Sequence, residues 1–278
     1  MRDIFITHLK KKILNMKCFI ILTTLLLCFP VSARIDSIFL TDGVKIEIKK
    51  EDECYYLLTA GKEKQQLKCI DDNLESDLII QDFNFDGYKD IAITNSLGMV
   101  NNVFYVFLYE HVNAAFKELR IADSATPKSA CGDLYNLVVQ LDDLSLVSSC
   151  RSGPVWYYDT YRYNDQGEIW LYKTTEYQIQ NSEIYTFPLY EHTFNQKGEK
   201  LDTVAIDFDG KKILWSVTSE KVFLYSSPEE TSKTKAYLIH NDKVEILAQK
   251  DDWIKIRFAS RKDPLIRWLY LPEAIAKS

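Results

Sequence analysis

The chain has 278 residues and a formal net charge of −6 at pH 7. This acidic balance argues against binding to the phosphates of nucleic acids and favours a basic partner. The alternative is that an acidic surface simply keeps the protein in solution.

The N-terminal segment has the pattern of a secretory signal peptide. A lysine precedes an apolar run over residues 18–29, and small residues lead to a cleavage point after Ala33. The run is shorter than the roughly 20 apolar residues that cross a bilayer, so we expect no permanent membrane span. We expect residues 1–33 to be removed, with translation beginning at Met1 or Met16. The mature protein would be periplasmic and carry a net charge of about −10.

Four cysteines remain after this cleavage. An even number of cysteines in an exported chain predicts two disulfides. Three pairings are possible, but each sequential pair flanks a segment that could fold back on itself as a hairpin. We therefore expect Cys54–Cys69 and Cys131–Cys150. A metal site at these cysteines would need closer Cys and His spacing.

Most of the chain has the pattern of short β-strands. Aromatic residues make up 13% of the sequence, which is typical of sheets, and apolar residues alternate rather than recur at helical spacing. The runs are bounded by turn signals such as Asp86-Gly87 and Gln166-Gly167. These patterns predict an all-β, antiparallel architecture, either propeller-like or of stacked sheets. The clearest runs are 44–48, 103–109, 157–163 and 244–248.

Residues 82–90 form the sharpest local motif. Side-chain oxygens at alternate positions, a glycine at position six, a backbone carbonyl at seven and a carboxylate at nine describe a calcium loop. Ile93 stands where a helix-loop-helix hand has glutamate, so the loop resembles the calcium turns of FG-GAP repeats. We expect a structural Ca²⁺ at this loop, with a calcium-free Asp-Gly turn as the alternative. Residues 207–210 have a similar start but lack a carboxylate at the ninth position, and they predict an ordinary hairpin turn. The expected calcium ligands are Asp82, Asn84, Asp86, Tyr88 and Asp90.

A candidate binding loop follows Cys150. Its glycine permits a tight turn, its proline stiffens that turn, and the adjacent disulfide would limit the entropy lost on insertion into a cleft. The alternative is that residues 152–154 form a plain turn while the following tryptophan packs in the core. The loop residues are Arg151, Ser152, Gly153, Pro154, Trp156 and Tyr157.

Residues 150–163 form an aromatic-rich stretch. Together with the calcium-like loop upstream and the turn at 164–168, this stretch resembles periplasmic immunity proteins. Those proteins block lysozyme-like toxins that bacterial secretion systems deliver as effectors. Known lysozyme inhibitors also carry a serine-glycine-x-x-tyrosine loop whose hydroxyls reach the catalytic carboxylates of the enzyme. Ser152 and Gly153 match that loop, whereas Trp156 replaces the tyrosine. The resemblance covers roughly Cys54 to Trp215. It implies that the domain at 34–216 inserts the loop at 151–156 into the active-site cleft of a basic, lysozyme-like peptidoglycan hydrolase.

The C-terminal segment shows a separate pattern after a boundary near 216–220. It contains a tyrosine-serine-serine-proline opening, a polar turn before a valine-x-isoleucine-leucine strand, an acidic turn before Trp253 and a last strand with Trp268. This order resembles bacterial SH3-like domains, which implies a small barrel over residues 219–278, although Arg267 replaces the usual glycine. Members of that family bind cell-wall peptide or act as interaction modules. The alternative function is therefore an envelope protein that binds peptidoglycan through this domain, and a domain that only stiffens its neighbour is a further alternative.

Candidate catalytic residues are scarce. None of His111, His192 and His240 belongs to a motif that ties it to a nucleophile or a metal. Ser152 lies outside a Gly-x-Ser-x-Gly elbow. Carboxylates on polar hairpin turns are usually solvated, so a glycosidase pair is not expected from their number alone. We expect a protein without enzymatic activity.

Overall fold

The computed structural model describes residues 35–39, 45–59, 61–71, 75–122, 127–179, 181–182, 184–260 and 263–275. The predicted signal peptide lies outside these residues. By its internal contacts the chain divides into two compact units, Met1–Cys69 and Ile70–Ser278. Among the described residues, no helix is long and apolar enough to cross a membrane.

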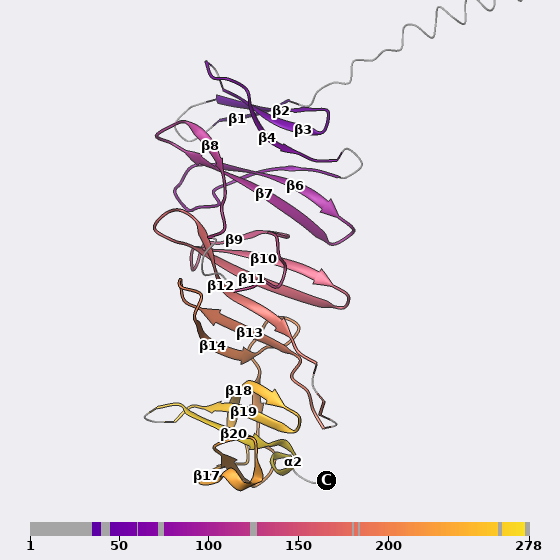
Figure 1. Ribbon diagram of the computed structural model, residues 1–278, viewed down its shortest axis with the longest axis vertical. Helices are drawn as coiled ribbons and strands as arrows, with labels where there is room; N and C mark the ends of the chain where they lie inside the picture. Colours follow the sequence, from indigo (N-terminus) through magenta and orange to yellow (C-terminus); the bar gives the residue numbers. More distant parts are fainter. Residues whose placement is uncertain are drawn as a thin grey trace, which may run out of the picture. The chain divides into compact units, whose positions relative to one another are not determined.

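The first unit contains one antiparallel sheet with the strand order β1-β2-β3-β4 (Figure 1, indigo). Apolar side chains on alternate positions of β2 and β3, among them Ile46 and Leu57, are buried because successive strand residues point to opposite faces. Cys54 lies directly opposite Cys69 and forms the predicted disulfide. The strands are β1 (Ile35–Phe39), β2 (Lys45–Glu51), β3 (Cys54–Thr59) and β4 (Gln65–Cys69).

The second unit begins with a four-stranded sheet in the order β5-β6-β7-β8. Residues 90–95 of β6 are all buried, as is typical of a strand covered on both faces. The strands are β5 (Leu78–Gln81), β6 (Asp90–Leu97), β7 (Asn101–Glu110) and β8 (Ala115–Glu118).

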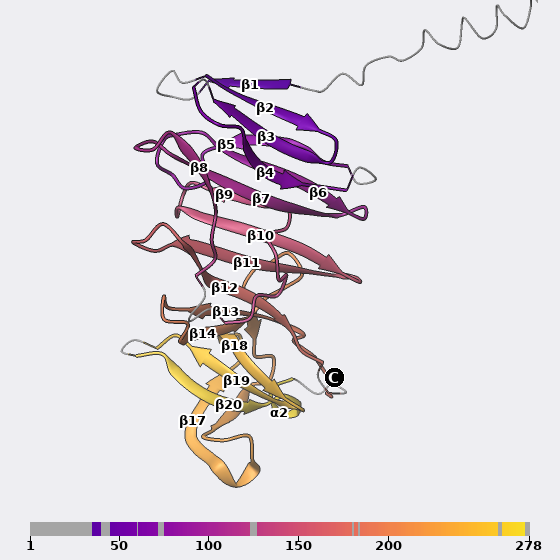
Figure 2. The same ribbon diagram turned by 45° about the horizontal axis from the view of Figure 1, so that its top comes forward.

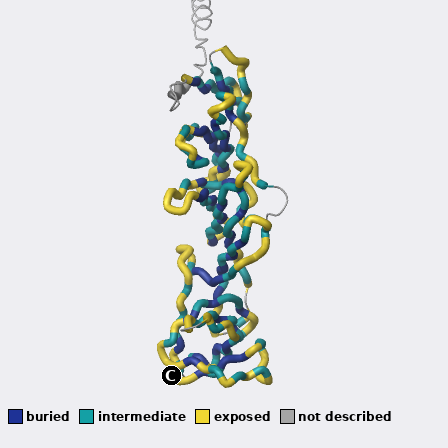
Figure 3. Tube along the Cα trace, turned by 90° about the vertical axis from the view of Figure 1, so that its left-hand side faces the viewer, coloured by how far each residue is buried: buried dark blue, intermediate teal, exposed yellow. Residues whose placement is uncertain are grey.

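A six-stranded meander follows, in the order β14-β13-β12-β11-β10-β9. Its core is continuous with that of the preceding sheet, because Phe83 and Val106 pack in one cluster with Leu146 and Tyr161. Figure 3 shows buried residues concentrated along the strands and exposed residues in the turns. The strands are β9 (Val138–Gln140), β10 (Ser145–Ser152), β11 (Val155–Tyr163), β12 (Ile169–Tyr177), β13 (Leu189–Phe194) and β14 (Lys200–Ala205).

Three hairpin turns of the second unit share one local design. In each, the side-chain oxygen of an Asn or Asp accepts the N–H groups of the residues two and four positions later, as Asn164 Oδ1 does at 3.0 and 2.9 Å. A glycine with positive φ occupies the position three residues later, where L side chains are strained. Residues 207–210 form such a turn, as the sequence predicted. The turns begin at Asn164, Asn195 and Asp207.

The C-terminal sheet has the order β15-β18-β19-β20-β16-β17. Leu214–Ser216, before the predicted boundary, pairs with β18 and so belongs to this sheet. Within the described residues the sheet does not close into a barrel, because β15 and β17 form its two edges. The elements are β15 (Leu214–Ser216), β16 (Lys221–Tyr225), the 3₁₀ turn Glu230–Ser232, β17 (Lys233–Ile239), β18 (Lys243–Lys250), β19 (Trp253–Phe258), β20 (Leu265–Tyr270) and α2 (Leu271–Ala274).

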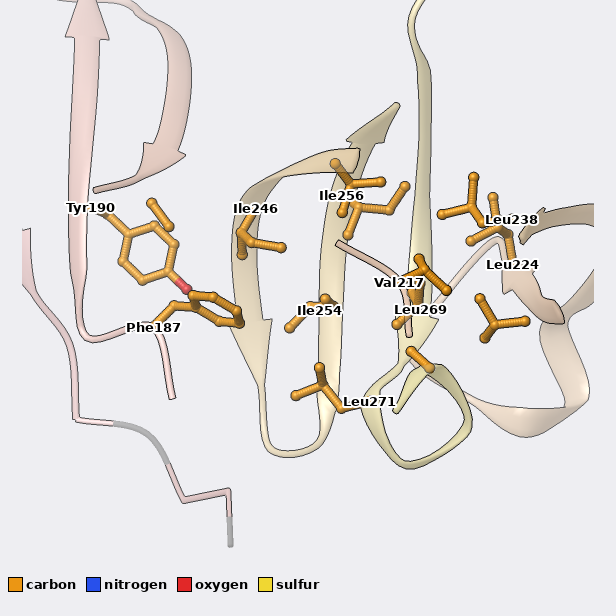
Figure 4. Close-up of a cluster of buried hydrophobic side chains, with 14 residues drawn as sticks. Phe187, Tyr190, Val217, Leu224, Leu238, Ile246, Ile254, Ile256, Leu269 and Leu271 are labelled. Atoms are coloured by element: carbon orange, nitrogen blue, oxygen red, sulfur yellow. The ribbon is translucent and has the colours of Figure 1, made fainter. Parts of the chain in front are cut away.

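This sheet shares its core with the meander. Phe187 and Tyr190, which are fully buried, lie beside Ile246 in one apolar cluster (Figure 4). The Phe187 N–H donates to Gln249 Oε1 at 2.9 Å, so a backbone group at this junction is also paired. The predicted antiparallel all-β class is confirmed, and the C-terminal sheet is packed against its neighbour.

Arg257 joins the same two sheets electrostatically. Its guanidinium contacts both carboxylate oxygens of Asp202 on β14 and lies 2.8 Å from Glu245 on β18. Hydrogen bonding from Arg257 and Thr203 outweighs the opposing effect of burial and keeps the pKa of Asp202 below its usual value. A bidentate pair of this kind adds orientation as well as attraction.

Candidate functional site: two braced turns

The predicted binding loop is the turn between β10 and β11. Ser152 pairs with Val155, which leaves Gly153 and Pro154 as a two-residue connection. Gly153 has φ of +60°, a conformation that glycine adopts at no steric penalty. Glycine at the first central position is typical of the type II′ turns that join twisted strands. The local sequence therefore folds into a tight hairpin end.

The six predicted loop residues lie together at this hairpin end but differ in exposure. Arg151 to Pro154 are exposed, whereas Trp156 and Tyr157 are half-buried on β11. Tyr157 packs against the apolar cluster that contains Val155 and Leu189. The turn is thus free to meet a partner, while Tyr157 also contributes to packing.

A disulfide and a buried carboxylate brace this hairpin. Cys150, two residues before Ser152, is bonded to Cys131 as predicted. The Cys131 N–H donates to Asp159 at 2.9 Å, and the fully buried Asp159 also accepts hydrogen bonds from the Ala130 N–H and the Thr174 hydroxyl. Burial raises the pKa of Asp159 above its usual value, although these donors oppose the shift.

A second turn, between β6 and β7, is tied to the first. Asn101 Nδ2 donates to the carbonyl oxygen of Arg151 at 3.1 Å, and Asn101 Oδ1 accepts the Arg151 N–H at 2.9 Å. Figures 1 and 2 show both turns at the same side of the second unit. We call residues 97–100 and 151–154 the paired turns.

Asn136 adds a further link between the two hairpins. Its Nδ2 donates to the carbonyl oxygens of Val100 and Ser149, each at 2.9 Å. Its Oδ1 accepts the Asn102 N–H at 3.2 Å. One amide side chain therefore contacts both hairpins directly, and the paired turns are held in a single arrangement.

The surface of the paired turns is apolar with one cation. Met99 is 100% exposed, Leu97 43% and Val100 40%. Arg151 carries the only formal charge on the paired turns, and its Nε donates to the Gly153 carbonyl oxygen at 3.1 Å. In the described part of the chain no carboxylate pairs with this guanidinium. This combination of exposed apolar side chains and a single cation suits a concave, apolar partner site that contains an acidic group.

The predicted calcium loop folds around its own backbone N–H groups. Asp82 accepts the N–H groups of Phe85 at 2.7 Å and of Gly87 at 2.9 Å. Asp86 Oδ1 accepts the Tyr88 N–H at 2.8 Å. The side chains at loop positions one and five are therefore part of a compact turn with positive φ at Phe85 and Gly87.

Asp90, the ninth loop position, points into the protein. It is fully buried and accepts the N–H groups of Phe83 and Tyr109, each at 2.8 Å, so it anchors the loop to β7. Burial, together with the charges of Asp86 and Asp82, raises the pKa of Asp90 to about 6 against the effect of the two N–H donors. Among the described residues, no group of three His, Cys, Asp or Glu side chains could hold a metal ion. The calcium site, which would also use amide and carbonyl oxygens, stays a prediction.

The fold does not bring the predicted calcium loop at 82–90 close to the turn at 151–154. The loop borders a polar cavity of about 660 Å³ that Glu110, His111 and Glu168 also line. Glu110 ends β7 and Asn101 begins it, so the cavity and the paired turns lie at opposite ends of that strand, about 30 Å apart at the rise of an extended chain. The two motifs predicted from the sequence therefore lie in separate regions of the second unit.

The histidines occupy separate environments. His192 is buried between Glu176, at 2.6 Å from Nε2, and the Thr203 hydroxyl, at 2.9 Å from Nδ1, so it links three neighbouring strands. His111 stacks on Tyr88 with ring centroids 4.8 Å apart. The absence of enzymatic activity stays a prediction.

The sequence alone missed half of this site. The apolar turn at 97–100 and the amides of Asn101 and Asn136 were not singled out. A glycine followed by methionine and valine between two strand patterns was the available signal for the turn. No local signal identifies the amides, because Asn101 acts on a residue 50 positions away.

Fold and site together define an antiparallel β-protein with two disulfides and a braced pair of exposed turns, and the disulfides are consistent with an extracellular or periplasmic location. No protein-family model and no curated protein matches this chain. The resemblances to immunity proteins and to SH3-like domains therefore stay predictions.

Proposed function

We propose that this protein is exported to the periplasm and inhibits a lysozyme-like peptidoglycan hydrolase by inserting the β10–β11 turn into its active-site cleft. The observation that carries the proposal is the braced, exposed turn whose Arg151 guanidinium has no carboxylate partner among the described residues. The two disulfides fit an oxidising compartment. The proposed role is binding, without a chemical step.

The bracing supports tight binding. A turn that is already held by a disulfide and by Asn101 loses little conformational entropy when a partner immobilises it. Glycan hydrolases hold two carboxylates at the scissile bond, which complement the charge of Arg151. The acidic remainder of the chain would attract a basic enzyme and speed the encounter.

Inhibition assays test this proposal directly. The full mature chain is mixed with chicken-type, goose-type and invertebrate-type lysozymes and with any hydrolase encoded beside its gene. We expect inhibition of at least one of them, weakened about tenfold or more by Arg151→Ala, because the enzyme's carboxylate loses its partner. The Ser152→Ala, Trp156→Ala double variant should also bind more weakly.

The matched control is Arg267→Ala, which removes another exposed arginine, on β20. It should inhibit like the wild type. Equal inhibition by the Arg151 and Arg267 variants would refute the turn assignment, and a wild-type protein that inhibits none of the enzymes would refute the function.

A cell-wall-binding role of the C-terminal sheet is the second candidate. Two exposed lysines, Lys221 and Lys233, lie 4.8 and 4.3 Å from the centroid of the Phe223 ring, beside a cavity of about 720 Å³. Cations next to an aromatic ring suit the carboxylates and sugar faces of peptidoglycan. Sedimentation with purified peptidoglycan separates the candidates, because a wall binder stays with the pellet and a pure inhibitor washes off.

We also propose that the loop at 82–90 holds a structural calcium ion. Asp82, Asn84 and Asp86 would supply side-chain oxygens and Tyr88 its carbonyl, while buried Asp90 anchors the loop. The ion would offset the repulsion among carboxylates that are close in sequence. Its effect would be to stabilise the loop and the strand that follows.

Thermal unfolding with calcium and with a chelator tests the ion. An ion bound only by the folded state at 100 times its Kd stabilises by about 2.7 kcal/mol, so Tm should rise with calcium. Asp86→Asn should abolish most of this rise, whereas the control Asp209→Asn, in the hairpin turn at 207–210, should retain it. A wild-type Tm that is equal with calcium and chelator would mean a calcium-free turn.

A further inference from the structure

The turn between β6 and β7 has no role in the function proposed above, although its surface is the more apolar of the paired turns. Leu97, Met99 and Val100 all expose side chains there, and Met99 is completely exposed. Exposing apolar side chains to water is unfavourable, so such a cluster at the end of a hairpin suggests a surface that a partner covers.

The position of this turn relative to Arg151 is fixed by hydrogen bonds rather than by proximity alone. Asn101, directly after the turn, holds both backbone polar groups of Arg151. The carbonyl of Val100 accepts a hydrogen bond from Asn136, which also contacts Ser149. A partner that receives Arg151 therefore meets the turn at 97–100 in the same approach.

We propose that Leu97, Met99 and Val100 form a second, apolar contact with the same hydrolase, against the wall of the cleft that receives Arg151. This inference rests on the proposed function and extends it from one turn to two. The occupant follows from complementarity: ligand clefts are concave and mostly apolar with a few polar groups, and the paired turns are protruding and apolar with a single cation. Asn101 and Asn136 are the positioning residues that keep the two contacts in register.

Met99 is suited to such a contact. Its unbranched, polarizable side chain adapts to irregular apolar surfaces, and it starts fully exposed, so binding removes its whole apolar surface from water. Full burial of a methionine corresponds to a change in affinity of about tenfold to a hundredfold. The backbone around it is held, which limits the entropy lost to ordering its side chain.

The test measures the inhibition constant of full-length variants against the hydrolase that the wild-type protein inhibits best. Met99→Ser should weaken inhibition by about ten- to a hundredfold, and Met99→Leu should retain most of it. The matched control is Val112→Ser, which removes a 94% exposed apolar side chain from the β7–β8 turn at the opposite end of β7. It should inhibit like the wild type, and all three variants should keep the wild-type Tm because their side chains are exposed.

Asn101→Ala separates positioning from direct contact. It removes both side-chain bonds to the Arg151 backbone while leaving the apolar side chains in place. We expect weaker inhibition, and we expect Met99→Ser to lose part of its effect in the Asn101→Ala background because the two contacts are no longer in register.

The outcomes distinguish the two proposals. If the wild type inhibits and Met99→Ser inhibits equally well, the second contact is overturned while the proposed function stands. Equal losses in Met99→Ser and Val112→Ser would also overturn it, because the effect would not be local. A wild-type protein that inhibits no hydrolase overturns both.

Discussion

Replacing Phe187 by alanine is expected to lower the free energy of unfolding by about 3–5 kcal/mol. Phe187 is fully buried between the meander and the C-terminal sheet, in a cluster with Tyr190 and Ile246 (Figure 4). The loss combines the transfer of the ring from water with the cavity that the truncated side chain leaves. Because the cluster belongs to both sheets, both should lose stability together.

Urea unfolding followed by tryptophan fluorescence measures this effect, since both sheets carry tryptophans: Trp156 and Trp170 lie in the meander, and Trp215, Trp253 and Trp268 lie in the C-terminal sheet. The control Phe208→Ala removes a phenylalanine that is 61% exposed in the turn at 207–210 and should change stability by about 0.5 kcal/mol or less. A Phe187→Ala variant as stable as this control would show that the two sheets do not depend on the shared core.

Replacing Asp159 by alanine is expected to lower the free energy of unfolding by about 3 kcal/mol or more. The change leaves the part-buried N–H group of Cys131 and the buried hydroxyl of Thr174 without this acceptor, and the Ala130 N–H keeps only its bond to the Thr174 oxygen at 3.2 Å. It also loosens the segment that carries Cys131, and thereby the brace of the binding turn. Chemical unfolding of the oxidised protein measures the stability, and the inhibition assay measures the effect on the turn.

The pH dependence of stability provides a second readout for Asp159. Burial raises its folded-state pKa above the unfolded value of 3.8, so the folded protein holds the proton more tightly. The stabilising contribution of Asp159 to the free energy of unfolding is therefore fully present below pH 3.8 and is lost as the pH rises through the folded-state pKa. Relative to Asp159→Asn, the wild type should lose stability as the pH rises from about 4 towards neutrality.

The control for this pH experiment is Asp165→Asn, which changes an exposed carboxylate in the turn at 164–168. Its stability should follow the wild-type pH profile. Parallel profiles for the wild type and Asp159→Asn would contradict the raised pKa.

Features that depend on neighbours in the sequence were predictable. Alternating apolar residues predicted antiparallel strands, and the spacing of the cysteines predicted both disulfides, because each pair encloses a segment that folds back on itself. Gly153 and Pro154 predicted a tight turn, which follows from the backbone preferences of those two residues. The turn at 207–210 was predictable for the same reason.

Features that depend on distant parts of the chain were not. Leu214–Ser216 has a strand pattern, but its pairing with β18 depends on which edge is open in the folded sheet. The buried position of Asp90 depends on the Tyr109 N–H, which is 19 residues away.

The sequence by itself determined the all-β class, the disulfide pairs and the tight turn at 152–155, because each arises from periodicity or turn chemistry over a short stretch. Only the tertiary structure decided that Asn101 meets Arg151, that the loop at 82–90 and the turn at 151–154 lie near opposite ends of β7, and that the C-terminal sheet shares its core with the meander. These arrangements depend on which apolar surfaces are buried together, and no local pattern specifies the partner of such a surface.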